Sequence, residues 1–197
     1  MVPQPTAKPV TDGRVTESTW TSALPDATGH KLVQLPLPVL DALGNGDLQL
    51  SRDLYSSALT PYIANDCSSV WRRRAAQINA DPKDAVWVSR LLLDKNGVVV
   101  GRAGFHGQPD EHGMVEVGYS VDPRHRRQGH ARAALRILLD VAAAESRVTT
   151  VRASVSPDNI PSRSLVNQFG FVEVGEQWDD EDGREIVLEI SCRVQKK

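Results

Sequence analysis

One short segment combines arginines and a glycine in a way that suits anion binding. Residues 122–138, DPRHRRQGHARAALRIL, hold five arginines and Gly129, and then continue with apolar residues at helical spacing. No Ser, Thr, Asp or Asn stands just before that helical pattern, so the first backbone N–H groups of the helix lack the usual side-chain acceptor. Because Gly129 lets other groups approach the backbone closely, a pyrophosphate could accept those hydrogen bonds, favoured by the helix dipole and the guanidinium groups.

Two other interpretations of this segment stay open on the residues alone. The arginines could form a solvated helix face with a water-capped N-terminus, or they could contact nucleic acid. The net charge of −2 disfavours the second, because proteins that hold a duplex by its phosphates usually present a basic face. A Walker phosphate loop is excluded, since no Gly-Lys-Ser/Thr sequence follows.

The elements around this segment are predicted by their periodicity. Residues 114–121, MVEVGYSV, alternate apolar side chains with Glu116, Gly118 and Ser120, which is typical of a strand with one buried face. From Gly129 the apolar period changes to 3.6 and predicts a helix of about four turns. A strand, TTVRASVS, and a short helix with Asn or Asp at its cap follow.

The order of the predicted elements indicates the fold class. The Asn-Gly dipeptide between VWVSRLLLD and VVVGRAGFHG predicts a hairpin, and FVEVGEQW with REIVLEISC predicts a final strand pair. This order is that of an α+β fold with a mostly antiparallel central sheet, because strands and helices do not alternate regularly. A dinucleotide-binding fold is disfavoured, and the GxGxxG motif is absent.

Length and composition limit the domain organisation and the setting. The 197 residues, 40% hydrophobic and 24% charged, fit one globular domain. We predict a flexible N-terminal extension over residues 1–28, rich in Pro, Thr and Ser, and a single domain over residues 29–197. Cys67 and Cys192 lack CxxC spacing, so we expect neither a disulfide framework nor a zinc site. No apolar run reaches the roughly 18 residues that span a bilayer, and we expect a cytoplasmic protein.

Three motifs in order resemble the GNAT superfamily of acyl-CoA-dependent N-acetyltransferases. RRQGHA, residues 126–131, matches the family's phosphate loop, in which Gln or Arg stands three residues before Gly and a small residue stands two after it. NIPSRSLVNQFGFVEVG resembles the segment in which Asn begins a helix that ends in Gly-Phe. EVGYSVDP is similar to the same segment of the branch that contains the ribosomal-protein alanine acetyltransferases. The matches cover residues 85–190.

The resemblance implies a mixed central sheet with helices on both faces and a splayed strand pair that holds acyl-CoA. The pantetheine arm would lie against one of these strands, the loop amides would bind the pyrophosphate, and an Asn would contact the cofactor near its sulfur. Acetyl-CoA is the implied cosubstrate, and no metal is expected. The implied cofactor-binding residues are Tyr119, Ser120, Val121, Arg126, Arg127, Gln128, Gly129, His130, Ala131, Arg132 and Asn159.

Acetyl transfer to an amine requires the unprotonated amine, so we expect a general base. Glu116 is the first candidate, because it stands on the small-residue face of the strand beside the cofactor, where partial burial would raise its pKa. His106 is the alternative base, since imidazole titrates near neutral pH. A structural ion pair for Glu116 and a surface position for His106 stay open.

The departing thiolate can take a proton from an acid. Many members of the family use a Tyr seven positions after the Asn, but this chain has Val166 there. Ser162 is the substitute candidate, although a role in the first turn of the helix fits it equally well. A thiol with a pKa near 8.5 needs only modest help. We expect the backbone N–H near Val121 to face the thioester oxygen.

These observations predict an acetyl-CoA-dependent N-acetyltransferase that acts on a primary amine of a small molecule or a peptide N-terminus. The acceptor pocket is expected from residues 47–75 and the loop near Trp178. No nucleic-acid or membrane partner is expected, and a homodimer is left open. The alternative is a non-catalytic acyl-CoA-binding module, which the missing tyrosine motivates.

Overall fold

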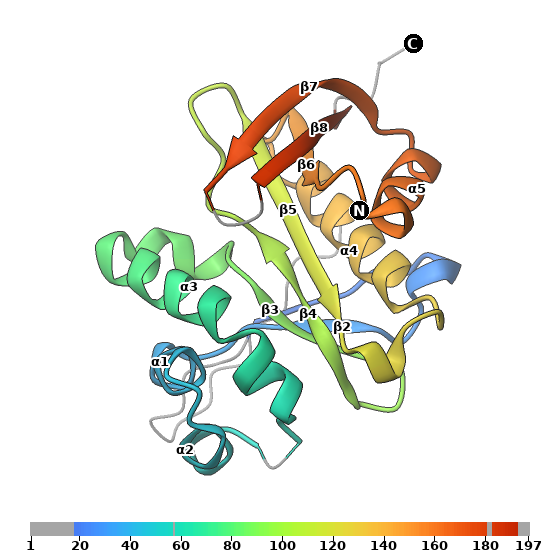
Figure 1. Ribbon diagram of the computed structural model, residues 1–197. Coiled ribbons are helices and arrows are strands. Elements are labelled where there is room, and N and C mark those ends of the chain that lie inside the picture. Colours follow the sequence, from blue (N-terminus) through green and yellow to red (C-terminus); the bar gives the residue numbers. More distant parts are fainter. Residues whose placement is uncertain (1–17, 57, 181–182, 193–197) are drawn as a thin grey trace.

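The computed structural model describes residues 18–56, 58–180 and 183–192. The strands of these residues form one sheet in the order β1-β2-β3-β4-β5-β6-β8-β7, in which only β5 and β6 pair in parallel (Figure 1). The predicted mostly antiparallel sheet is confirmed. The strands are β1 Thr19–Trp20, β2 Lys31–Val33, β3 Arg90–Leu93, β4 Val99–Phe105, β5 Met114–Val121, β6 Thr150–Val155, β7 Val172–Asp179 and β8 Gly183–Ser191.

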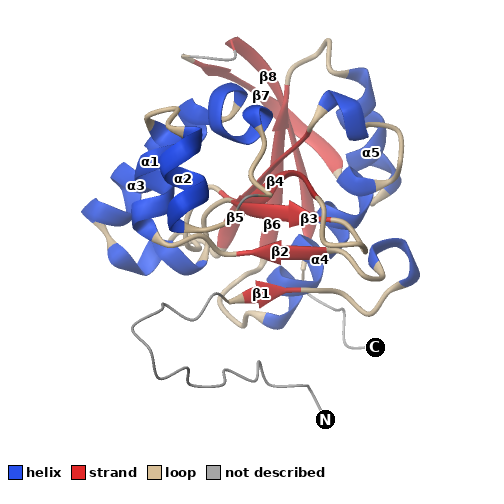
Figure 2. Ribbon diagram, turned by 90° about the horizontal axis from the view of Figure 1, so that it is seen from below, coloured by secondary structure: helices blue, strands red, loops and turns tan. Residues whose placement is uncertain are grey.

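Helices cover both faces of the sheet, as predicted (Figure 2). One group lies on the face that carries Leu91, and the other packs against the face that carries Val117. The first group is α1 Leu37–Gly44, α2 Leu48–Leu54 and α3 Ser68–Ala80, and the second is α4 His130–Ala144 and α5 Ile160–Gln168. Short turns of helix lie at η1 Pro25–Ala27, η2 Tyr62–Asp66, η3 Pro82–Val86 and η4 Pro123–His125. None of the described helices is long and apolar enough to cross a membrane.

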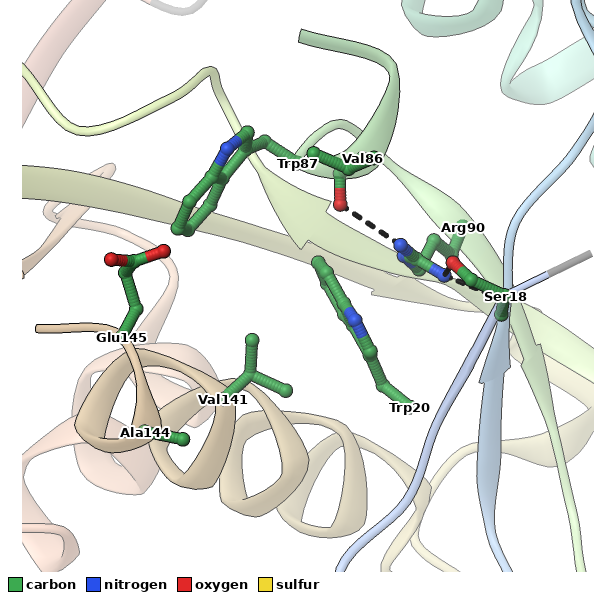
Figure 3. Close-up of a pocket in the computed structure, with 8 residues that line it drawn as sticks. All are labelled: Ser18, Trp20, Val86, Trp87, Arg90, Val141, Ala144 and Glu145. Carbon is green, nitrogen blue, oxygen red and sulfur yellow. Dashed lines mark hydrogen bonds between the residues drawn. The ribbon is translucent and has the colours of Figure 1, made fainter. Parts of the chain in front are cut away.

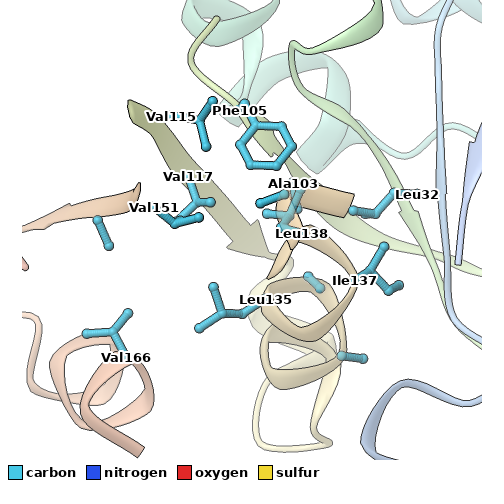
Figure 4. Packing of buried hydrophobic residues seen from close by; sticks show 14 of the residues in the cluster. Leu32, Ala103, Phe105, Val115, Val117, Leu135, Ile137, Leu138, Val151 and Val166 are labelled. Atoms are coloured by element: carbon cyan, nitrogen blue, oxygen red, sulfur yellow. The ribbon is translucent and has the colours of Figure 1, made fainter. Parts of the chain in front are cut away.

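The apolar stripe of α4 forms the centre of the larger core. Leu135 and Leu138 are fully buried and lie toward Val117 and Val151 of the sheet (Figure 4). Burial of one such leucine stabilises the fold by about 2 kcal/mol relative to an exposed side chain. The residues of α4 that recur with a period of 3.6 are therefore the ones that contact the core. This packing also fixes the direction in which the N-terminus of α4 points.

The parallel pair in the middle of the sheet separates after a few residues. The β5–β6 pairing runs from Met114–Thr150 to Glu116–Arg152. Beyond that point β5 continues to Val121, while the rest of β6 pairs only with β8. The two strands thus diverge after Glu116, which is the splayed pair that the resemblance implies.

Residues 18–28 belong to the folded domain, so the predicted extension over 1–28 is wrong for this part. β1 pairs with β2, and Trp20 packs edge-to-face on Phe105, with ring centroids 5.6 Å apart. Ala27 is fully buried, and the Ser22 hydroxyl donates to Asp140 of α4. A two-residue strand is too short to give a periodic signal, which explains the error. Residues 1–17 lie outside the described part.

Candidate functional site

The N-terminus of α4 lacks a side-chain cap, as the sequence predicted. Gly129 is the cap residue, with φ of +85° and no side-chain hydrogen bond. A Cβ atom added there would meet no described atom within 4 Å, so the space in front of the helix is open. Arg127 also adopts a positive φ, +64°, which costs a non-glycine residue about 1–2 kcal/mol. Backbone turns of this kind, followed by a free helix N-terminus, suit a phosphate.

The five arginines of this segment are not equivalent. Arg124 pairs with the buried carboxylate of Asp122 at 2.6 Å, and Arg136 pairs with Asp26. Arg126 donates through Nε to the carbonyl of Val121 at 3.1 Å. Residues 126–129 are exposed. The charge available to an anion therefore belongs to the loop itself and not to the whole arginine segment.

His130 and Arg132, which belong to the predicted cofactor-binding set, already contact other residues. The ring Nδ1 of His130 lies 2.9 Å from Nε2 of His30, and burial lowers the pKa of His130. The guanidinium of Arg132 donates to Gln168 of α5. The ring Nδ1 of His130 is thus engaged with His30, whereas its backbone N–H at the start of α4 can donate to a phosphate.

The splay leaves one edge of β5 unpaired by strands. The carbonyl of Glu116 accepts from His106 N, and Asp122 N donates to Val100 O, so both residues direct their backbone groups toward β4. Since direction alternates along a strand, Tyr119 and Val121 direct theirs to the β6 side, where the pairing has ended. Ser120 points back to β4, which makes it a poorer backbone partner for a cofactor than the sequence suggested.

Glu116 is the last β5 residue that pairs with β6, and its side chain is mostly buried, with 19% exposed. Removal from water raises its pKa, against the hydrogen bond with Ser154 and the charges of Arg152 and Arg74. A carboxylate that is both shielded and easier to protonate has the properties of a general base.

His106 lies beside Glu116, with Nδ1 3.6 Å from the Glu116 Oε1. The imidazole covers Gly118, where an added Cβ would lie 2.7 Å from Nε2. The side chain is 44% exposed, yet the surrounding protein and then the guanidinium groups of Arg74 and Arg102 lower the pKa of His106 to about 4. The imidazole is therefore neutral at pH 7 and a weak base.

Asn159 and Ser162 lie at the N-terminus of helix α5, which follows β6, the second strand of the splayed pair. The Asn159 side chain accepts from Ser162 N at 3.2 Å and so caps the helix. The Ser162 hydroxyl lies 2.7 Å from the phenol of Tyr119 on β5. Val166 is fully buried, so its position supplies no acid. The hydroxyl groups of Ser162 and Tyr119 are therefore the candidates to stabilise the departing thiolate in place of a Tyr at position 166.

The comparison with known families agrees with this geometry. The family model described as acetyltransferase (GNAT) domain matches residues 48–172. The chain belongs to the GNAT acetyltransferases. The resemblance to this superfamily that the three sequence motifs showed is thereby confirmed, and the protein is an acyltransferase.

Known relatives extend this finding. The Bacillus subtilis (strain 168) protein YjdG, named an uncharacterized N-acetyltransferase, is 27% identical over 145 residues, which cover 72% of this chain and 85% of that protein. The fold is similar to that of a ribosomal-protein-S5-alanine acetyltransferase from Vibrio fischeri, with a TM-score of 0.59 and 18% identity over 86% of this chain and 96% of the other. It is also similar to the microcin C7 self-immunity acetyltransferase MccE, solved with acetyl-CoA and AMP, with a TM-score of 0.59 and 15% identity over 84% and 94%.

Sequence reasoning missed several residues of this GNAT domain that face the same side of the sheet as Glu116. The Tyr62 phenol of η2 lies 2.5 Å from the Ser120 hydroxyl. Arg74 of α3 donates to the carbonyl of His106 at 2.9 Å. Arg102 of β4 stands opposite Ser120 in the strand register. Tyr62 and Arg74 lie in the segment 47–75 that was expected to build the acceptor side, whereas Arg102 lies on β4. The sequence pattern gave no reason to single out any of the three side chains.

A pocket of about 280 Å³ lies elsewhere in the GNAT domain, between β1, η3 and the end of α4 (Figure 3). Its residues are Ser18, Trp20, Val86, Trp87, Arg90, Val141, Ala144 and Glu145. The Arg90 guanidinium stacks on Trp20 at 3.5 Å and donates to the carbonyls of Ser18 and Val86. These contacts attach residues 18–20 to the domain, and no predicted site residue lines this pocket.

Proposed function

We propose that this protein transfers an acetyl group from acetyl-CoA directly to a primary amine of a small molecule or a peptide N-terminus, with Glu116 as the general base. The observation that carries the proposal is the place of Glu116 at the point where β5 and β6 separate. A carboxylate at that point stands between the unpaired edge of β5 and the face of the sheet on which residues of the segment 47–75 gather.

The loop before α4 and the unpaired edge of β5 have the groups that an acyl-CoA donor would need. The open space at Gly129 and the uncapped start of α4 suit the pyrophosphate, with Arg126, Arg127 and Gln128 around it. The backbone groups of Tyr119 and Val121 that face the splay suit the amides of the pantetheine arm. When bound there, acetyl-CoA supplies an activated thioester, and the Val121 N–H is the proposed donor to its oxygen.

The base is assigned by the charges around the two candidates. A free alkylamine is protonated at pH 7, so it must lose a proton before it attacks. With its pKa lowered to about 4, His106 binds protons too weakly to serve. Removal from water raises the pKa of Glu116, which strengthens it as a proton acceptor. His106, 3.6 Å away, is then a positioning residue.

The role of stabilising the departing thiolate is assigned to a hydroxyl pair. Ser162 is the proposed hydrogen-bond donor to the departing thiolate, and the Tyr119 phenol, 2.7 Å from it, orients the Ser162 hydroxyl, while the thiolate takes its proton from water as CoA leaves. Burial raises the pKa of Tyr119, so the phenol keeps its proton at neutral pH. No covalent enzyme intermediate is needed, because the amine attacks the thioester directly.

Thiol release from acetyl-CoA, measured against amines, amino acids, polyamines and peptide N-termini, tests this proposal. We expect turnover with at least one class of amine and acetylated product by mass spectrometry. The rival is the non-catalytic acyl-CoA-binding module. Tight binding of acetyl-CoA with no turnover on any amine would support the module and contradict the proposed function.

A further inference from the structure

Two guanidinium groups on the sheet face of Glu116 are not used by the mechanism above. We infer that the amine acceptor also carries an anionic group, a carboxylate or a phosphate, which binds Arg102 and Arg74. This inference rests on the proposed function and names the chemical class of its acceptor. We call the side of β4 and β5 that bears Glu116, His106 and Arg102 the polar face.

Arg74 is a buried cation without a carboxylate partner. Its side chain comes from α3, and the residue is 6% exposed. Nη1 donates to the Gln77 side chain and to the carbonyl of His106, while Nε is buried with no hydrogen-bond partner in the described part of the chain. The charges of Asp84 and Glu116 also act on the pKa of Arg74, but neither carboxylate forms an ion pair with it, so its guanidinium can still attract an anion.

Arg102 presents a second such group on the polar face. It lies opposite Ser120 in the register of β4 and β5 and is half-buried. Its Nε is also buried without a partner, and its guanidinium contacts the thiol of Cys67. In the described ranges no carboxylate forms an ion pair with Arg74 or Arg102. The planar arginine fork binds carboxylates and phosphates by paired hydrogen bonds.

The acidic groups near this face are occupied. Glu189 pairs with Arg152 at 2.6 Å, and Glu185 accepts from the Gln177 amide at 2.9 Å. Asp84, whose charge acts on Arg74, accepts from the Gln77 amide at 2.8 Å and from the backbone N–H of Gln108 at 3.0 Å. The positive charges of Arg74 and Arg102 act on this face, because after burial they are the next causes that lower the pKa of His106. A polyamine would bring further positive charge toward these groups, whereas an anion would be attracted.

The spacing suits one molecule with two functional groups. Glu116 and Ser120 are four residues apart on β5, which separates their Cα atoms by roughly 13 Å. Arg102 stands across from Ser120, and the Glu and Arg side chains are long enough for their charged groups to lie closer together than the two Cα atoms. An amine at Glu116 and an anion at Arg102 can therefore belong to one small acceptor, such as an amino acid or a short aminoalkyl phosphate.

The test compares matched amines. Initial rates with acetyl-CoA are measured for glycine, β-alanine and 4-aminobutanoate against their carboxamides, for ethanolamine phosphate against ethanolamine, and for 1,4-diaminobutane. Rates are expressed per concentration of unprotonated amine, because a carboxylate shifts the amine pKa. We expect at least one anionic member to exceed its neutral partner about ten-fold or more in kcat/KM, and the two series separate a carboxylate from a phosphate.

Arg102→Gln should remove that preference, with little change for the neutral partner and for the KM of acetyl-CoA. Arg147→Gln is the matched control, since Arg147 pairs with Glu145 near the surface, and it should keep the preference. A wild type that prefers neutral amines or the diamine, equal losses on all amines in Arg102→Gln, or a raised KM for acetyl-CoA would overturn the inference.

Calorimetric binding of the same pairs to the protein saturated with CoA separates this inference from the proposed function. Tighter binding of the anionic member, lost in Arg102→Gln, supports the acceptor class even if no amine is turned over. An absence of turnover on every amine contradicts the proposed function instead, and equal binding of anionic and neutral members contradicts the inference.

Discussion

The carboxylate of Glu116 is 19% exposed, and removal from water raises its pKa, while Ser154, Arg152 and Arg74 act in the opposite direction. Its partners thus favour the ionised carboxylate, whereas its burial favours the protonated form. His106 beside it is neutral at pH 7, because its pKa falls to about 4. The sequence could name both residues as candidates, but only their surroundings distinguish a base from its neighbour.

Glu116→Gln is expected to lower kcat by about 100-fold or more, because a general base contributes at least that much, and to leave acetyl-CoA binding nearly unchanged. In the wild type the rate should fall as the pH falls through the raised pKa of Glu116, since only the ionised form accepts a proton. Steady-state rates over pH 5–9 and calorimetry with CoA check this. Unchanged turnover in the variant would remove Glu116 as the base.

The same substitution has an expected effect on stability. A carboxylate whose pKa is raised in the folded state stabilises the fold below its unfolded pKa, and this contribution is lost as the pH rises through the folded pKa. The neutral Gln should therefore raise the melting temperature above that of the wild type at pH 7–8 and not at pH 4. Calorimetric melting at both values checks this. A lower melting temperature for the variant at pH 8 would contradict the shift.

Ser162 and Tyr119 should behave as one unit. Ser162→Ala and Tyr119→Phe are each expected to lower kcat several-fold, and the double variant should lose little more, because either change interrupts the same hydrogen bond of 2.7 Å. The kinetics of the two single variants and the double variant form the test. Fully multiplicative losses would show that the two hydroxyls act separately.

At the scale of elements, the start of α4 and its loop are proposed to bind the pyrophosphate of acetyl-CoA through backbone N–H groups. Gly129→Glu should abolish acetyl-CoA binding, because it places bulk and negative charge in the open space before the helix. Gly97→Glu is the matched control, since Gly97 has a similar φ of +81° and equal free space in the β3–β4 turn. Calorimetry should show loss of binding only in the first variant. Wild-type affinity for Gly129→Glu would refute the phosphate site.

The elements with a clear period or a strong turn signal could be predicted from the sequence. Strand β5, helix α4 and the β3–β4 hairpin contain such signals, and so does the uncapped Gly129. Strand β1, helix α2 and turn η2 have none, because they are short and their positions depend on contacts with residues far away in the chain. The contact between Tyr62 and Ser120, 58 residues apart, is of this kind. The sequence therefore predicted the segment 47–75 for the acceptor but not which of its side chains reach the sheet.

At the scale of the whole molecule, residues 18–28 connect the N-terminal end of the described chain to both the sheet and α4. Arg90, 1% exposed, donates to Ser18 and stacks on Trp20 (Figure 3). Residues 18–28, which were predicted to be part of a flexible extension, therefore belong to the folded unit. Their removal would expose Phe105 and leave the buried Arg90 with the carbonyl of Val86 but without its acceptors on Ser18.

Trp20→Ala is expected to lower the free energy of unfolding by about 3 kcal/mol, because it removes the contacts with Phe105 and Arg90. The affinity for acetyl-CoA, measured below the melting temperature, should stay near that of the wild type, since Trp20 lies away from Gly129. Urea unfolding and calorimetry test the two parts. A loss below 1 kcal/mol would mean that residues 18–28 do not support the fold.

Among the described residues, three residue pairs, Met114–Thr150 to Glu116–Arg152, connect β1–β5 to β6–β8 through the sheet. In mechanical terms the pairing at Glu116 is a hinge between two half-sheets, and a molecule bound in the splay bridges them as an additional strand would. Acetyl-CoA at 100 times its dissociation constant adds about 2.7 kcal/mol to the stability of the folded state. The amides of β5 and β6 beyond the hinge should therefore exchange hydrogen more slowly when it is bound, so that the donor substrate also unites the enzyme into one cooperative unit.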